Sequence, residues 1–173
     1  VLVSIGAFFA ALAVAYAFAL ADRPERGPAH FSNWFWWSTT LLVVSSITFE
    51  RARSTLLFAR FDAYRRELLA TTLIGTAFLS TQLLGCFDLS AQGVYVVGNP
   101  RGSMYFIFSG VHGFHLAGGI GALIWLTRKA RTLQDGEEQP LRKHRAAAKH
   151  VASYWHFMGV LWLGLFALLL LWK

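Results

Sequence analysis

Three histidines stand inside apolar stretches of the sequence, where ionisable side chains are uncommon. Two of them, His112 and His115, form the motif Gly-x-His-Gly-x-His at residues 110–115. The third, His156, belongs to the sequence Tyr-Trp-His-Phe at residues 154–157. An ionisable group at membrane depth is costly, so it usually faces protein, water or a lipid headgroup. An imidazole in such a place can bind a metal or a haem iron, or can hydrogen-bond to a neighbouring helix.

The spacing of the histidines allows two kinds of site. His112 and His115 are three residues apart and therefore share one face of a helix. His156, on a second helix, could add a metal ligand, and a b-type haem between two helices would take one histidine from each. Two histidines three residues apart are poorly placed to bind opposite faces of one haem, and the sequence puts no carboxylate at the same depth. Packed, hydrogen-bonded histidines are therefore favoured, with a metal site or a stand-alone b-type cytochrome as alternatives.

The acidic residues give no catalytic pattern. Glu50, Glu67 and Asp88 all fall at the ends of apolar stretches. Ion pumps and ion-coupled transporters usually need carboxylates inside the membrane, and the sequence shows no pair of proline-interrupted spans. We therefore expect no catalytic residues in this chain, and a small transporter remains a weaker alternative.

Five apolar stretches must position these side chains. The chain of 173 residues is 55% apolar and 14% charged, compared with about 45–50% apolar in a soluble domain. A bilayer core of about 30 Å needs roughly 20 helical residues. The apolar stretches cover residues 1–21, 31–50, 68–87, 104–127 and 151–172. We therefore expect an all-α fold, a single membrane domain over residues 1–173 that is an integral bundle of five transmembrane helices.

The first stretch is interpreted as a spanning helix rather than a signal peptide, because no basic region precedes it and no clear cleavage site ends it. The chain starts at Val1 instead of methionine, so either its N-terminus is processed or preceding residues are absent. A single cysteine, Cys86, excludes an internal disulfide and a Cys-x-x-Cys metal site.

The connectors between the stretches carry most of the charge. Residues 51–67 are basic, with aromatic residues at three-residue spacing, which predicts a short helix lying in the membrane interface. Residues 88–103 are rich in glycine and predict a turn. Most of the 16 lysines and arginines fall in residues 51–67 and 128–150, and positive charge marks the cytoplasmic side. We therefore expect a cytoplasmic N-terminus and an outer C-terminus, and we attribute the net charge of +7 to this orientation rather than to nucleic-acid binding.

Four motifs follow one another along the chain. The second stretch contains Ser-Thr-Thr-Leu-Leu-Val-Val-Ser-Ser at residues 38–46, and the third contains Ile-Gly-Thr-Ala-Phe-Leu-Ser-Thr-Gln at residues 74–82. The two histidine motifs follow, the last one extending to Trp162. In their order and spacing these motifs resemble subunit III of the haem–copper oxidases (cytochrome c oxidase and ubiquinol oxidase), in a five-helix form.

The resemblance implies a non-catalytic accessory subunit that docks on the catalytic subunit I and on other oxidase subunits of an aerobic respiratory chain. It implies binding of structural phospholipid, stabilisation of subunit I, and support of proton uptake during O2 reduction. It also implies no cofactor in this chain, because haem and copper belong to the partner. A subunit associated with nitric oxide reductase is an alternative. The expected location is a bacterial plasma membrane.

The residues that we expect at lipid or interhelical contacts are His112, His115, Trp155, His156, Arg101, Ser45, Ser46 and Gln82. Trp155 is expected to pack between the fourth and fifth helices. Arg101 either meets a phosphate or a neighbouring subunit, or lies in a solvated loop. Two carboxylates of the family are replaced here, one by Gly159 and one near Gly85, so any role they have beside the motif histidines is lost or relocated.

Overall fold

The structure, a computed structural model, describes residues 2–21, 32–93, 100–133 and 138–171. Within these ranges the chain forms five helices and contains no strand. The helices are α1 (Leu2–Ala21), α2 (Trp34–Leu57), α3 (Phe61–Ala91), α4 (Pro100–Ala130) and α5 (Glu138–Leu171). The all-α prediction is confirmed. That residues 1–173 make a single domain stays a prediction.

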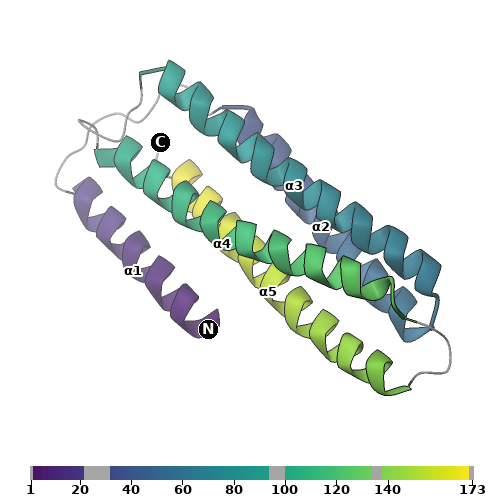
Figure 1. The fold of residues 1–173 in the computed structure, drawn as a ribbon. Helices are drawn as coiled ribbons and strands as arrows, with labels where there is room; N and C mark the ends of the chain where they lie inside the picture. The colour runs from purple at the N-terminus through teal and green to yellow at the C-terminus, as the bar shows by residue number, and fades with distance from the viewer. Residues whose placement is uncertain (1, 22–31, 94–99, 134–137, 172–173) are drawn as a thin grey trace.

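Helices α2 to α5 form a four-helix bundle, and α1 lies on its outside (Figure 1). The backbones of neighbouring helices in the bundle approach one another in the cyclic order α2, α3, α4, α5. Among the described helices, α1 contacts only α4 and α5. The side chains on the inner faces of α2 to α5 therefore form the core.

Three helices are long and apolar enough to cross a membrane: Phe61–Ala91, Tyr105–Ala130 and Gln139–Leu170. At about 1.5 Å per residue, each exceeds a hydrocarbon core of roughly 30 Å. The described part of the first helix, Leu2–Phe18, is apolar but shorter. Helix α2 has 24 residues, but tryptophans at its start and hydroxyl residues along it lower its mean hydropathy. Length and composition alone therefore identify three of the five expected spans within the described residues.

The helices extend beyond the expected apolar stretches at one end of the bundle. We call this the basic end, because it carries described residues of the Lys- and Arg-rich segments 51–67 and 128–150. Residues 51–67, expected as a short interfacial helix, are instead the end of α2 and the start of α3. The chain turns between them at Ala59, which has a φ of 53°. Helix α5 likewise begins inside the expected connector, at Glu138. The buried faces continue through these basic segments, with Tyr64 on α3 and His144 on α5 both buried, which explains why the helices do not end at the apolar boundary.

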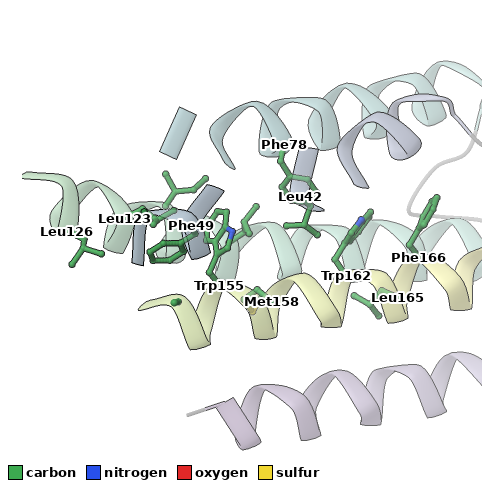
Figure 2. Packing of buried hydrophobic residues seen from close by; sticks show 14 of the residues in the cluster. Leu42, Phe49, Phe78, Leu123, Leu126, Trp155, Met158, Trp162, Leu165 and Phe166 are labelled. Carbon is green, nitrogen blue, oxygen red and sulfur yellow. The ribbon is translucent and has the colours of Figure 1, made fainter. Parts of the chain in front are cut away.

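Large aromatic side chains fill the middle of the bundle where small residues make room for them. Trp155 and Trp162 of α5 are both fully buried and lie on one side of the helix, toward Leu42 and Phe78 (Figure 2). A Cβ atom at Gly75 of α3 would come within 2.6 Å of the Trp155 ring. Glycine is therefore needed at that position for α3 to approach α5.

Candidate functional site

Trp155 connects all four helices of the bundle. Its indole Nε1 donates a hydrogen bond of 3.1 Å to Ser45 Oγ of α2. Its ring lies against Gly75 of α3 and Gly119 of α4, where added Cβ atoms would be 2.6 and 3.3 Å from ring carbons. The sequence predicted that Trp155 packs between α4 and α5. In the structure it also contacts α2 and α3.

A second polar layer lies one heptad further along α5. Trp162 Nε1 donates a hydrogen bond of 3.1 Å to Thr39 Oγ1 of α2, and Ser38 Oγ donates one of 3.0 Å to Gln82 Oε1 of α3. Gln82 was an expected contact residue, but Thr39 and Trp162 were not. The seven-residue spacing of Trp155 and Trp162 could have indicated this contact, because it puts both indoles on one face of α5. In the structure that face meets hydroxyl groups of α2.

His112 lies in an aromatic surrounding built by three helices. The side chain is 1% exposed, and its ring centroid is 5.3 Å from that of Trp162, 6.3 Å from Phe9 and 6.4 Å from Phe78. Within the described ranges, neither ring nitrogen has a hydrogen-bond partner. We expected an interhelical or headgroup hydrogen bond here. The contacts that the structure shows are instead ring packing against α1, α3 and α5.

His115 links α4 to α5 through its backbone. Its Nδ1 donates to Val111 O at 2.8 Å, within α4. The hydroxyl of Tyr154 on α5 donates a hydrogen bond of 2.8 Å to His115 O. The interhelical bond therefore belongs to Tyr154, a residue of the Tyr-Trp-His-Phe motif that was not among the expected contacts.

His156 lies on a different face, at a groove between α2 and α5. Its Nε2 is 3.5 Å from Glu50 Oε2, and this carboxylate also accepts a hydrogen bond of 2.7 Å from Arg53. The groove has a volume of about 360 Å³ and is also lined by Ser46 and Gly159. The carboxylate beside His156 thus comes from α2, whereas Gly159 of α5 stands where the resemblance noted above would place a carboxylate.

The histidines therefore have separate surroundings, an aromatic interior for His112 and a carboxylate-bearing groove for His156. In the part of the chain that the structure describes, no group of three or more His, Cys, Asp or Glu side chains could hold a metal ion. Arg101 belongs to the first turn of α4, but its side chain lies outside the described residues, so its expected contact stays a prediction.

Arginines at the basic end, where the α2–α3 turn lies, cap neighbouring helices by binding backbone carbonyls at their C-terminal ends. Arg65 of α3 donates from Nε to Ala130 O and from an Nη to Leu133 O, both at 3.0 Å, at the end of α4. Arg145 of α5 donates to Leu56 O and to Leu57 O, both at 3.2 Å, at the end of α2. The last carbonyls of a helix lack intrahelical partners and carry partial negative charge. From the sequence we linked the basic residues 51–67 to membrane orientation, and the contacts of Arg65 show that it also joins α3 to α4.

Comparison with known proteins gives one consistent family. The family profile described as cytochrome c oxidase subunit III matches residues 35–173. The "Probable cytochrome c oxidase subunit 3" of Nocardia farcinica is 30% identical over 129 residues, covering 75% of this chain and 61% of the relative. The "Cytochrome c oxidase subunit 3" of Corynebacterium diphtheriae is 35% identical over 133 residues, covering 74% of this chain and 60% of the relative. A Mycobacterium tuberculosis relative is 26% identical over 170 residues, covering 94% of this chain and 79% of the relative.

Proposed function

Because the chain belongs to the cytochrome c oxidase subunit III family, we propose that it is a non-catalytic accessory subunit of a respiratory haem–copper terminal oxidase. The family match is the observation that carries this proposal. It begins at Phe35, the second residue of α2, and covers the rest of the α2–α5 bundle, which contains both histidine motifs. The resemblance inferred from the four motifs is thereby confirmed.

In this role the chain docks on the catalytic subunit I, which carries the haem and copper, and on other oxidase subunits. It steadies subunit I, retains phospholipid and supports proton uptake during O2 reduction. The filled interior supports a scaffold role, because Trp155 and Trp162 occupy the space between the helices and use their indole groups for helix contacts. A rigid bundle of this kind can hold the position of a partner and of lipids without taking part in electron transfer.

The chain is a multi-pass membrane protein, as its family and its long apolar helices indicate. We place it in a bacterial plasma membrane with its N-terminus in the cytoplasm. The α2–α3 turn, the end of α4 and the start of α5 lie at the same end of the bundle (Figure 1), and residues 51–67 and 128–150 are rich in arginine and lysine. Positive charge gathered at one end supports a cytoplasmic position for that end.

The test is a mild-detergent purification through a tag on this chain, with an optical spectrum and mass spectrometry of the co-purified material. We expect a haem–copper catalytic subunit to co-purify. All haem absorbance should persist when His112 and His156 are both replaced by alanine, provided that the complex is retained. Purification of this chain alone would contradict the proposal, and haem absorbance carried by the lone chain and lost with these histidines would make it a cytochrome.

A further inference from the structure

The α2–α5 face has a groove made of two adjoining parts that differ in chemistry. Its inner part, of about 360 Å³, is lined mainly by apolar residues, and its outer part, of about 440 Å³, is lined by three cations and one carboxylate. Glu50 lines both parts, so the two adjoin at this residue. We call the whole feature the α2–α5 groove.

The inner part lies at the depth of the apolar stretches and opens outward. Ile47 of α2 and Val160 of α5 are 56% and 69% exposed on its rims. Gly159 lies at its base, where an added Cβ would be 3.8 Å from Leu42 and from Ser46 Oγ. The absence of a side chain at Gly159 therefore leaves room for an apolar chain to lie between the two helices.

The outer part lies beyond the apolar stretches, at the basic end. Its cations are Arg53, Arg145 and Lys149. Arg145 is held by the carbonyls at the end of α2, and Arg53 is paired with Glu50. Lys149 is exposed and forms no hydrogen bond or ion pair with any described residue. Three cations against one carboxylate leave a net positive charge at headgroup level, where each Lys or Arg attracts anionic lipid by about 1 kcal/mol.

We propose that the α2–α5 groove binds one anionic phospholipid. Its acyl chain lies along Gly159 and Val160, and its phosphate lies between Arg53 and Lys149. Ten residues of helix separate Gly159 from Lys149, about 15 Å along the axis, so one molecule with an apolar tail and a charged head matches both parts at once. The proposal assigns a site and a lipid class to the phospholipid binding in the proposed function, and it rests on that function only for the membrane setting.

The experiment uses the chain in its complex, reconstituted into nanodiscs that contain phosphatidylcholine and a photoactivatable lipid with a diazirine in its acyl chain. The probe lipid is phosphatidylglycerol in one arm and phosphatidylcholine in the other. After irradiation, mass spectrometry identifies the labelled peptides. We expect labelling of the groove segments of α2 and α5, with phosphatidylglycerol labelling them several-fold more than phosphatidylcholine.

Two variants test the two parts of the groove separately. Arg53→Gln with Lys149→Gln leaves one cation against the carboxylate, and we expect the several-fold preference for phosphatidylglycerol to be lost. Arg66→Gln with Arg128→Gln is the matched control, because it removes two exposed positive charges outside the groove. Gly159→Leu fills the apolar part and should reduce labelling by both lipids.

Equal labelling by the two lipids, or labelling confined to other faces, would overturn the proposal. So would a photo-crosslink from a groove residue to a polypeptide of the catalytic subunit, because a partner helix would then occupy the groove. The haem spectrum of the same sample reports separately on the proposed function. If no haem-bearing subunit co-purifies while the groove is still labelled selectively, the accessory role fails and the lipid site stands.

Discussion

At the scale of single residues, Trp155 shows how this membrane protein uses polar groups to hold helices together. A hydrogen-bond donor inside a bundle needs a partner because no water is available in the hydrocarbon region. The Trp155 indole donates a hydrogen bond of 3.1 Å to Ser45 Oγ, and the Ser45 hydroxyl donates one of 2.7 Å to Leu42 O. One serine therefore both accepts from α5 and satisfies a carbonyl of its own helix.

A double-mutant cycle on Trp155→Phe and Ser45→Ala should measure this contact. We expect each single variant to lower the free energy of unfolding, with a coupling of about 0.6 kcal/mol, the size found for interhelical hydrogen bonds in membranes. The measurement is denaturant unfolding of the chain in detergent. A matched cycle on Trp162→Phe and Thr39→Ala tests the second indole bond. Strictly additive effects in both cycles would show that the two bonds do not stabilise the fold.

Gly75 should tolerate no larger residue. Gly75→Ala would put a Cβ atom within 2.6 Å of the rigid Trp155 ring, so the two helices would have to move apart. Overpacking of this kind costs about 1–3 kcal/mol. Gly118→Ala on α4 is the control, because its Cβ would meet nothing within 4 Å. Thermal denaturation in detergent should show a lower Tm for the first variant only, and equal Tm values would contradict the packing described here.

At the scale of elements, Arg65 and Arg145 each form an arginine cap: a side chain on one helix that binds the C-terminal carbonyls of another. Helix α4 ends at Ala130, and Arg65 binds its last carbonyls from α3. Helix α2 ends at Leu57, and Arg145 binds its last carbonyls from α5. Because the capping groups come from other helices, the basic end of the bundle is held in register by the same residues that give it its charge.

Removal of the Arg65 cap should loosen the end of α4. In Arg65→Met the carbonyls of Ala130 and Leu133 lose a charged donor, a loss of about 1 kcal/mol for a partly exposed bond. Hydrogen–deuterium exchange should then speed up in the last turn of α4 and leave the middle of the helix unchanged. Arg66→Met removes the neighbouring, exposed charge and should leave exchange as it is. If exchange in the last turn of α4 became equally faster in both variants, the loss of positive charge would be the cause. If it changed in neither, the Arg65 contacts would not stabilise this end of α4.

The sequence predicted the helices better than their ends. Five apolar stretches located all five helices, because apolar length is a strong signal. The boundary at residue 50 was wrong as a helix end, since α2 continues to Leu57 with Ala52 and Leu56 buried. An apolar run predicts the part of a helix inside the membrane. The helix itself continues for as long as one of its faces is buried against other helices, as α2 does to Leu57.

The polar contacts were only partly predictable for a related reason. Gln82 and Trp155 could be named from their motifs, but their partners Ser38 and Ser45 depend on how α2 is rotated. The pairing of His156 with Glu50 of α2 likewise joins residues more than 100 positions apart in the chain. No local spacing encodes such a contact, so only the packed bundle reveals it.

At the scale of the whole molecule, charge and apolar surface divide the bundle along its axis. One end carries the α2–α3 turn, the end of α4, the start of α5, and the helix-capping arginines Arg65 and Arg145 (Figure 1). The aromatic layers around Trp155 and Trp162 lie further along the axis. Such a molecule has one stable orientation in a membrane whose cytoplasmic face attracts positive charge.

Cysteine labelling should establish that orientation directly. In a background where the single cysteine is replaced, Cys86→Ser, Lys143→Cys marks the basic end and Gln92→Cys marks the end of α3, and both native residues are exposed. A membrane-impermeant maleimide added to intact cells should label the Gln92 variant and spare the Lys143 variant. Inverted vesicles should give the opposite pattern, which controls for the reactivity of each site. Labelling of the Lys143 variant in intact cells would reverse the orientation, and the anionic phospholipid of the α2–α5 groove would then belong to the outer leaflet.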